Sequence, residues 1–310
     1  MTRFGVAVPN FGPDVSTDWI RQWAARAEKS GFDLVALSDH IPTTTDVHDK
    51  YVAPFYEPFT TLSFVAAETR RIDVATSAIV LPHRHPLVVA RMAVNLDAFS
   101  GGRFILGLAP GWSEQEYAAL GLDFARRGPL MDDALGAMHQ LWQAREDFTD
   151  YEGPYFTYRG VSTAPRPERP IPLWIGANHR AAVRRCVQWR AAWHPAIWNL
   201  DWFEHTALPE LEKAAERYGG PVPEVCAKLK VFLTDAEIDP DQRRPGEGRL
   251  DQVVADVERL AGLNVHTILL DTDDARVRYA PRGLDDHWRV LDGLLAEAPS
   301  VTEAARRALS

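Results

Sequence analysis

The chain has 310 residues, of which 46% are hydrophobic and 25% charged, and its formal net charge at pH 7 is −9. This composition excludes a disordered chain, a collagen and a pure coiled coil. The basic residues form no consecutive block, so we expect no surface for nucleic acid or for anionic membranes, since both need clustered Lys and Arg. Two cysteines, Cys186 and Cys226, predict buried thiols in a reducing compartment and no disulfide framework.

The first nine residues run directly into an apolar strand pattern and lack the basic start and apolar segment of a secretory signal. No uninterrupted apolar stretch of about 18 residues is present. We therefore expect a cytoplasmic protein without a membrane partner. The basic residues are strongly biased toward Arg, which we attribute to the genome rather than to function; the lysines are Lys29, Lys50, Lys213, Lys228 and Lys230.

Short apolar runs alternate with amphipathic ones along the whole chain. Residues 4–8 predict a strand, and residues 17–30 predict a helix that Gly31 ends in the left-handed conformation. Further strands are expected at residues 32–37, 72–80, 103–108, 173–175, 191–194, 225–233 and 265–270. Further helices are expected at residues 58–69, 87–99, 129–142 and 284–295, and in the stretches that begin at Ala181, Leu200 and Leu250.

Strands that are nearly continuous in apolar character, each followed by a helix, indicate a parallel sheet that is covered on its outer face. We therefore predict an α/β fold, a (β/α)8 TIM barrel in which residues 1–310 form one domain. A doubly wound open sheet is the alternative, but Pro9-Asn10-Phe11-Gly12 follows the first strand in place of Gly-x-Gly-x-x-Gly. Two insertions are expected, a β-hairpin at residues 147–161 and a polar loop at residues 235–248.

Chemistry in such a barrel lies at the C-terminal ends of the strands. The second strand ends at Asp39-His40, and a His beside an Asp at this position suits proton transfer near pH 7. The alternative is that Asp39 caps a loop and His40 packs in the interior. His40, His83 and His85 lack the spacing and the carboxylate of a metal site, so we expect no metal and interpret His83 and His85 as exposed hydrogen-bond donors.

The fifth strand is followed by Gly176-Ala177-Asn178-His179 and then by a helix. The free N–H groups and the dipole at a helix start can bind a phosphate. Small residues are also common at strand–helix junctions, so this feature by itself leaves open a phosphate site or a plain junction.

Several segments together carry a family resemblance. The most specific are residues 96–104 (Leu-Asp-Ala-Phe-Ser-Gly-Gly-Arg-Phe), Gly111-Trp112 with Glu116-Tyr117, and residues 171–176 (Ile-Pro-Leu-Trp-Ile-Gly). With Ser38-Asp39-His40 they closely resemble the luciferase-like monooxygenase family, whose members bind FMN or the deazaflavin coenzyme F420 in a TIM barrel. The resemblance extends from Phe4 to about Pro195, and the Gly-Arg and Gly-Trp pairs around the fourth strand point to the F420-dependent branch.

The resemblance implies that a tricyclic ring lies across the barrel mouth. The ring would rest on a bulge near Ser77-Ala78, which in such enzymes often contains a non-prolyl cis peptide. Asp39 would form a hydrogen bond with the ring, and His40 would donate or accept the proton at its reacting edge. The other implied contacts, with the ring, the ribityl chain and the phosphate, are Gly111, Trp112, Glu114 or Gln115, Gly176, Ala177 and Asn178. Many relatives have paired Gly and then Ser at the last of these positions, so the phosphate contacts stay open in detail.

Two reaction classes follow from the resemblance. In the first, an F420-dependent reductase or dehydrogenase passes hydride between the deazaflavin C5 and a small organic substrate, reducing a C=C or C=N bond or oxidising an alcohol, while His40 handles the proton. In the alternative, a two-component monooxygenase uses FMN and oxygen. Deazaflavin forms no useful peroxide because carbon replaces N5, so the cofactor decides the class. A flavin-binding barrel without activity is a third possibility, against which the Asp39-His40 pair argues.

Aromatic residues in the loops after the strands predict an apolar wall for the substrate, although each of them suits a packed position equally well. These residues are Tyr51, Phe55, Trp112, Trp198 and Trp202. The sequence does not name the substrate.

A homodimer is also expected. The helices at residues 58–69 and 87–99 carry apolar side chains on more than one face, which exceeds what packing on one sheet requires. Relatives commonly pair through this region, and a two-fold interface would cover the surplus. The alternative is that the hairpin or a neighbouring helix covers it within one chain. The residues concerned are Leu62, Phe64, Val65, Val88, Val89, Met92 and Val94.

Overall fold

The main sheet of the protein closes into a barrel of parallel strands. The computed structural model describes residues 2–273 and 283–309. Its strand order is β10-β11-β14-β1-β2-β3-β5-β8-β9, with β4 paired to β5, and an isolated parallel bridge from Trp193 to Val225 joins the two ends of this order. The strands are β1 (Arg3–Ala7), β2 (Leu34–Leu37), β3 (Asp73–Thr76), β4 (Ile79–Val80), β5 (Phe104–Ala109), β8 (Leu173–Gly176), β9 (Ala192–His194), β10 (Ala196–Ile197), β11 (Cys226–Lys230) and β14 (Thr267–Asp271).

The predicted TIM barrel is therefore confirmed, with three local corrections. The strand predicted at residues 72–80 is interrupted between β3 and β4, and the strand predicted at 191–194 resumes after Pro195 as β10. The strand predicted at 225–233 is correct only as far as Lys230. Beyond it, β12 (Phe232–Leu233) leaves the barrel and pairs with β13 (Glu247–Gly248), which lies at the end of the predicted polar loop.

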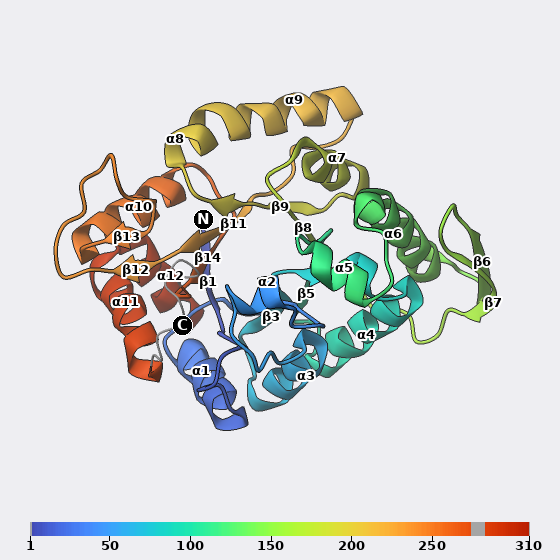
Figure 1. The fold of residues 1–310 in the computed structure, drawn as a ribbon, viewed down its shortest axis with the longest axis horizontal. Helices are drawn as coiled ribbons and strands as arrows, with labels where there is room; N and C mark the ends of the chain where they lie inside the picture. Colours follow the sequence, from blue (N-terminus) through green and yellow to red (C-terminus); the bar gives the residue numbers. More distant parts are fainter. Residues whose placement is uncertain (1, 274–282, 310) are drawn as a thin grey trace.

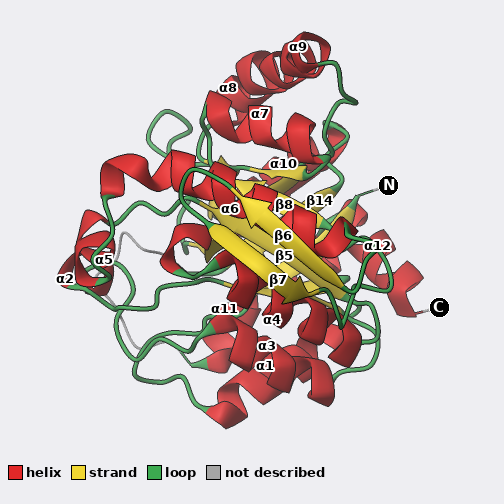
Figure 2. Cartoon of the chain, turned by 90° about the vertical axis from the view of Figure 1, so that its right-hand side faces the viewer, coloured by secondary structure: helices red, strands yellow, loops and turns green. Residues whose placement is uncertain are grey.

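Helices surround the ring of strands (Figure 1). They are α1 (Thr17–Lys29), α3 (Pro58–Glu68), α4 (Pro86–Phe99), α6 (Arg127–Gln143), α7 (Arg180–Trp189), α8 (Leu200–Trp202), α9 (Leu208–Tyr218), α10 (Leu250–Gly262), α11 (Leu284–Glu297) and α12 (Pro299–Leu309). The sequence did not predict α12 or two short helices, α2 (Thr45–His48) and α5 (Glu114–Ala119). Figure 2 shows α2 and α5 at the end of the molecule opposite to the two chain termini. None of the described helices combines the length and the apolar character that a membrane crossing needs.

The core has two parts because successive side chains of a strand point to opposite faces of the sheet. One large cluster fills the space between the strands and the helices. A smaller cluster comes from alternate positions on several strands and fills the inside of the barrel: Leu34, Ala36, Ala75, Ile105, Trp174, Cys226 and Leu269. Residues that follow these in steps of two along a strand therefore point into the barrel mouth.

The hairpin predicted at residues 147–161 is confirmed. It consists of β6 (Phe148–Glu152) and β7 (Thr157–Ser162), which are antiparallel. The Tyr158 hydroxyl donates to the Ala137 carbonyl 2.9 Å away, and the Tyr151 hydroxyl donates to Asp133 at 2.7 Å. The hairpin therefore packs on α6, at the edge of the molecule and away from the ring of strands (Figure 1).

Two smaller predictions are also confirmed. Gly31 has a φ of 83°, as expected after the first helix. A Cβ atom at this position would lie 2.5 Å from the carbonyl oxygen of Ala305 in α12, so the close approach of α12 also requires glycine. Cys186 and Cys226 are both free and buried.

Candidate active site

A cavity of about 170 Å³ lies at the C-terminal ends of the barrel strands. Because each strand contributes the residues that follow its last paired position, segments far apart in the sequence meet here. The lining comes from the ends of β1, β2, β3, β5, β11 and β14 and from the loops after them: Ala7, Val8, Pro9, Phe11, Ala36, Ser38, Asp39, His40, Tyr51, Ser77, Ala78, Val80, Ala109, Gly111, Trp112, Lys228, Asp271 and Asp273.

His40 lines this cavity and pairs with Glu116 of α5. The Nδ1 atom of His40 lies 2.9 Å from the Oε2 atom of Glu116, and the two side chains are only 7% and 0% exposed. The His40 ring stacks on Tyr51 at 5.4 Å and meets the edge of Trp112 at 5.6 Å. Burial raises the pKa of Glu116, and the hydrogen bond with His40 lowers it in part. Among the described residues, the second oxygen of Glu116 has no partner.

Glu116 belongs to the segments that carry the family resemblance, but the resemblance implies no role for it. Ser113-Glu114-Gln115-Glu116 has the spacing of a capping box, and the Ser113 hydroxyl does accept a hydrogen bond from the backbone N–H of Glu116 at 3.1 Å. The Glu116 side chain turns toward His40, however. The local pattern therefore predicts the start of α5 but not the partner of the carboxylate.

Asp39 is held by the loop that follows β4. Its carboxylate accepts hydrogen bonds from Arg84 at 2.6 and 2.9 Å and from the Val80 backbone N–H at 2.8 Å. Arg84 also bonds to Glu57 at 2.9 Å. Both oxygens of Asp39 therefore have partners within the chain, and Asp39 positions the end of β2 against this loop. A bond between Asp39 and a bound ring would have to form beside these contacts.

The peptide bond between Ser77 and Ala78 is cis, as the resemblance implied. The Ser77 hydroxyl lies 2.8 Å from Nε2 of His194, whose Nδ1 bonds to the Cys226 carbonyl. A carbonyl only accepts, so Nδ1 carries the hydrogen and Nε2 accepts the Ser77 proton. Burial lowers the pKa of His194 to about 4, which keeps the ring neutral. The Ser77 oxygen therefore offers only its lone pairs to the cavity.

The prediction of an exposed donor is wrong for His83. This residue is buried, with its ring edge-on to Tyr117 at 4.7 Å, and neither ring nitrogen has a partner among the described residues. Burial lowers its pKa to about 4. His85 is exposed as expected, but its Nδ1 accepts the Leu87 backbone N–H at the start of α4. Within the described ranges, no three His, Cys, Asp or Glu side chains are placed to hold a metal ion.

The predicted loop residues divide into two groups. Gly111 and Trp112 line the cavity, and a Cβ atom on Gly111, whose φ is 77°, would lie 2.6 Å from a Val80 methyl group. Glu114 is exposed, and Gln115 accepts a hydrogen bond from the Thr45 hydroxyl at 2.7 Å. Neither of these two lines the cavity.

The aromatic predictions divide in the same way. Tyr51 and Trp112 line the cavity, and Phe55 stacks on Phe11 with the ring centroids 5.3 Å apart. Trp198 is exposed and Trp202 packs on the large outer core, so the structure does not bring them to this cavity.

The junction after β8 is tied to β10. The Asn178 side chain donates to the Ala196 carbonyl at 2.7 Å and accepts the Ala196 N–H at 3.1 Å. The Ala177 carbonyl accepts the indole N–H of Trp193 at 2.9 Å. The side chain of Asn178 is therefore engaged within the fold, and only backbone groups of this segment remain as phosphate donors at the start of α7.

Four charged residues at the ends of β11 and β14 also face the barrel mouth and were not predicted from the sequence. Lys228 and Lys230 follow the interior residue Cys226 in steps of two, and Asp271 and Asp273 follow the interior residue Leu269 in the same way. Strand alternation alone therefore gave a signal that these charges face the barrel mouth. Asp271 is buried, and Lys228, Asp271 and Asp273 line the same cavity as His40.

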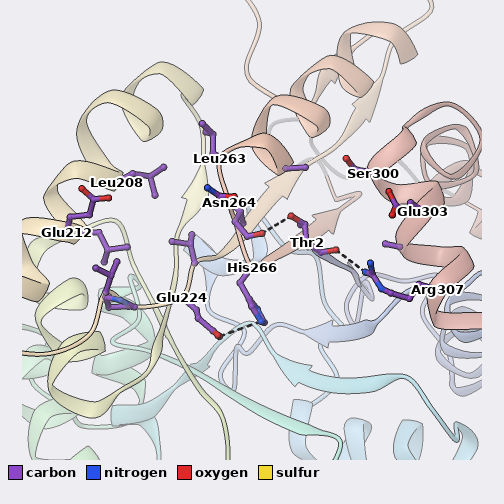
Figure 3. A pocket seen from close by; sticks show the side chains of 17 residues that line it. Thr2, Leu208, Glu212, Glu224, Leu263, Asn264, His266, Ser300, Glu303 and Arg307 are labelled. Carbon is purple, nitrogen blue, oxygen red and sulfur yellow. Dashed lines mark hydrogen bonds and ion pairs between the residues drawn. The ribbon is translucent and has the colours of Figure 1, made fainter.

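A larger cavity, of about 580 Å³, lies at the other end of the barrel (Figure 3). It is lined by residues that precede β1, β11 and β14, and by parts of α9, α10 and α12. Figure 3 shows His266 and Glu224 facing one another, and their closest charged atoms are 3.7 Å apart. No residue that the sequence singled out as a site candidate lines this cavity.

The chain is similar to proteins of known families. The model of a family described as luciferase-like monooxygenase matches residues 2–243. An F420-dependent glucose-6-phosphate dehydrogenase of Microbacterium testaceum is 34% identical over 59% of this chain, which spans 53% of that relative's length. A protein of the same description from Nakamurella multipartita is 31% identical over 76% of this chain and 69% of its own length.

Other similar proteins carry different descriptions. The pyrimidine monooxygenase RutA of Cronobacter turicensis is 38% identical over 43% of this chain and 35% of its own length. The solved structure of an F420-dependent secondary alcohol dehydrogenase, in complex with an F420-acetone adduct, superimposes with a TM-score of 0.77 over 97% of this chain and 99% of that one. At 16% identity, this second similarity shows the fold alone.

Proposed function

Because this chain belongs to the luciferase-like monooxygenase family, we propose that it is a coenzyme F420-dependent oxidoreductase that transfers hydride between the deazaflavin C5 and a small organic substrate. The observation that carries the proposal is the buried His40–Glu116 pair, of which His40 lines a cavity at the C-terminal ends of the strands. The two relatives described as F420-dependent dehydrogenases support the choice of cofactor.

The cavity fits a planar ring. Small side chains, Ala36, Ala78 and Ala109, line it together with Gly111, where a Cβ atom would collide with Val80. The Ser77 oxygen, which acts only as an acceptor toward the cavity, suits an N–H or O–H group of a ring. We assign Ser77, Ala78, Gly111 and Trp112 to the ring, and the backbone of Gly176, Ala177 and Asn178 to the phosphate.

When it is bound, deazaflavin accepts or donates a hydride, which carries two electrons. The residues of this chain supply the proton. The Glu116 carboxylate accepts the Nδ1 hydrogen of His40, which leaves Nε2 as the nitrogen that exchanges a proton with the substrate. Tyr51 and Trp112 flank the His40 ring and limit its contact with water. Glu116 positions the imidazole and fixes its tautomer through the hydrogen bond at Nδ1.

A titration of the purified apoprotein with F420 and with FMN under the same conditions tests the proposal. We expect F420 to bind at least tenfold more tightly, a difference of about 1.4 kcal/mol in binding free energy. The His40→Ala variant is the matched control, since it should keep the same ratio of the two affinities. Tighter binding of FMN would contradict the proposal.

The alternative function is an FMN-dependent two-component monooxygenase, which the similarity to pyrimidine monooxygenase RutA favours. The two functions differ in their use of oxygen. With reduced FMN and a substrate, a monooxygenase consumes oxygen in proportion to its product, whereas an F420-dependent oxidoreductase turns over equally well without oxygen.

We also propose that the enzyme is a homodimer. Of the apolar residues on α3 and α4, Leu62, Val65, Val89 and Val94 are buried within the chain, whereas Val88 is 50% exposed. The end of β7 and the segment after it reach α4 through polar contacts: Arg91 donates to the Ser162 and Pro165 carbonyls, and Arg169 donates to Asp97. Phe64 on α3 and Met92 on α4 are partly buried, and Met92 lies one helical turn after Val88. We assign these three residues to the surface that a second copy would cover.

Light scattering at micromolar concentration tests the dimer. We expect twice the chain mass of 34.7 kDa for the unaltered protein and the chain mass itself for Val88→Asp. A mass of 34.7 kDa for the unaltered protein would contradict the proposal.

A further inference from the structure

The barrel mouth contains a compact cluster of two lysines and two aspartates, which we call the mouth cluster: Lys228, Lys230, Asp271 and Asp273. The Lys228 ammonium lies 2.9 Å from Asp271 Oδ2. The Lys230 ammonium donates to the Asp273 carbonyl at 2.8 Å and lies 3.3 Å from its carboxylate. The backbone N–H of Asp273 donates to Asp271 Oδ1 at 3.0 Å. The proposed hydride transfer assigns no role to this cluster.

The position of the mouth cluster connects it to the candidate active site. Lys228, Asp271 and Asp273 line the cavity that also contains His40, and the Lys230 ammonium lies 5.8 Å from the ring centroid of Tyr51, which stacks on His40. Asp271 is buried, and the Lys228 side chain is only 21% exposed. A charged group that is kept inside a barrel mouth in this way is expensive to desolvate, which argues against a purely structural role.

The charges of the mouth cluster balance at neutral pH. Burial would raise the pKa of Asp271, but Lys228 and Lys230 lower it to about 2. Burial and the neighbouring Asp271 raise the pKa of Asp273 to about 6, so both aspartates are largely ionised at pH 7. An anionic group such as a phosphate would meet the carboxylates of Asp271 and Asp273 beside the two ammonium groups and would be repelled by them. A balanced cluster therefore favours an uncharged polar ligand over an anion.

The residue type adds a second argument. The chain has 34 basic residues, and of its few lysines Lys50, Lys228 and Lys230 all lie at the mouth. Lys50 places its ammonium 3.7 Å from the centroid of the Trp112 ring. An ammonium is a compact donor with three N–H bonds, unlike the planar fork of Arg, which suits carboxylates and phosphates. The Arg bias of the chain therefore has an exception at this site, and genome composition does not explain it.

The Lys228 ammonium has more N–H donors than its ion pair with Asp271 uses. Among the described residues, its ammonium pairs with Asp271 alone, which uses one of its three N–H bonds. The remaining donors suit a carbonyl or hydroxyl oxygen of a ligand in the cavity. His40 lines the same cavity, so the lining around a bound substrate holds both a hydrogen-bond donor and a proton-exchanging group.

We propose that Lys228, held by Asp271, binds the reacting oxygen of an uncharged alcohol or carbonyl substrate. The inference rests on the proposed function and names its substrate class. In the oxidising direction the C–H bond breaks and its hydrogen leaves as a hydride with both electrons of the bond. The proposed function makes deazaflavin the acceptor of this hydride. The O–H proton passes to His40, and a C=O bond forms. Lys228 donates a hydrogen bond to this oxygen in both substrate and product.

Carbon NMR of protein labelled at lysine Cε tests the contact directly, because so few lysines give a resolved spectrum. The probes are uncharged alcohols from 2-propanol to cyclohexanol, and inorganic phosphate, added to the F420-loaded protein. We expect the Lys228 signal, assigned with Lys228→Arg, to shift and saturate with the alcohols but not with phosphate. Lys213, which pairs with Glu210 on α9, is the internal control. A response to phosphate alone, or no response to any of the alcohols, would overturn the proposal.

Kinetics with Lys228→Gln provides the second test. We expect KM for the alcohol that binds best to rise about tenfold, in line with the loss of a hydrogen bond from a charged donor, while the Kd of F420 stays within twofold. Lys213→Gln is the matched control, because Lys213 pairs with Glu210 on α9, outside the mouth cluster and the cavity, and it should change KM less than twofold. A tenfold loss of F420 affinity in Lys228→Gln would instead place this lysine on the cofactor.

The two proposals fail separately. If F420 binds more tightly than FMN but Lys228 does not respond to the alcohols, only the substrate class is wrong. If FMN binds more tightly and Lys228 still responds, the contact is correct and the hydride-transfer function is wrong.

Discussion

Each end of the barrel carries a cavity that is lined by the histidine of a His–Glu pair, and the pairs differ in burial. At the C-terminal end, His40 and Glu116 are 2.9 Å apart and 7% and 0% exposed, and His40 lines a cavity of about 170 Å³. At the N-terminal end, His266 and Glu224 are 3.7 Å apart and 40% and 64% exposed, in a cavity of about 580 Å³ (Figure 3). The larger cavity therefore has the weaker pair.

Burial determines what such a pair can do. Water and salt screen an exposed pair, whose net contribution to stability is about 0 to 1 kcal/mol. A buried pair keeps a fixed geometry and a fixed tautomer, which proton transfer requires. The choice of the candidate site in this barrel therefore rests on the burial of its titratable groups and not on cavity size.

The largest expected effect concerns stability at the C-terminal end. The pKa of His194 is about 4 in the fold, below the ordinary value of 6.5, so between these values the unfolded chain binds a proton that the folded chain does not. This histidine should therefore lower the free energy of unfolding by about 3 kcal/mol as the pH falls from 6.5 to 4. Its contribution is complete above pH 6.5.

Urea unfolding at a series of pH values measures this effect. The free energy of unfolding of the unaltered protein minus that of His194→Asn should fall with pH by this amount. The contributions of the other titrating groups cancel in this difference. His266→Asn makes the same substitution at the other end of the barrel and controls for the change of side chain. A difference for His194→Asn that does not vary with pH would remove burial as the distinction between the two ends.

The next largest effect is on turnover. We expect His40→Ala to lower kcat by about 100-fold or more, since general acid–base catalysis typically contributes that much, and to leave F420 affinity nearly unchanged. The kcat of His266→Ala should stay within twofold of the value for the unaltered enzyme. Steady-state kinetics and cofactor titration measure both.

Asp39→Ala should instead weaken cofactor binding, because it releases Arg84 and the loop after β4. Exchanged effects for His40 and Asp39 would mean that their roles are reversed.

A smaller effect is expected for the carboxylate partners. Glu116→Gln should lower kcat about tenfold, because the amide positions the imidazole less firmly than a carboxylate does. The same substitution in a His40→Ala background should have almost no effect, which a purely structural role of Glu116 would not produce. Glu224→Gln is the matched variant at the other end and should leave kcat unchanged. Additive losses in the double variant would reject the positioning role.

The sequence by itself determined the barrel. Alternation of apolar strands and amphipathic helices is a local pattern that the chain repeats, and so the layers of the fold, the hairpin of β6 and β7 and the glycine after α1 are legible without a structure. Family resemblance added the cis peptide at Ser77-Ala78 and drew attention to His40. These features depend on residues that are close together in the chain.

Only the tertiary structure decided which side chains meet. Glu116 reaches His40 across 76 positions of sequence, and His194 reaches Ser77 across 117. Lys228 meets Asp271 because β11 and β14 are neighbours in register, although α10 and long loops separate them in the chain. Such pairs arise from strand order and barrel closure, and a local pattern contains neither. For the same reason the prediction for His83 was wrong, since its burial comes from residues distant in the chain, such as Tyr117, that pack around the short 3-10 helix Leu81–His83.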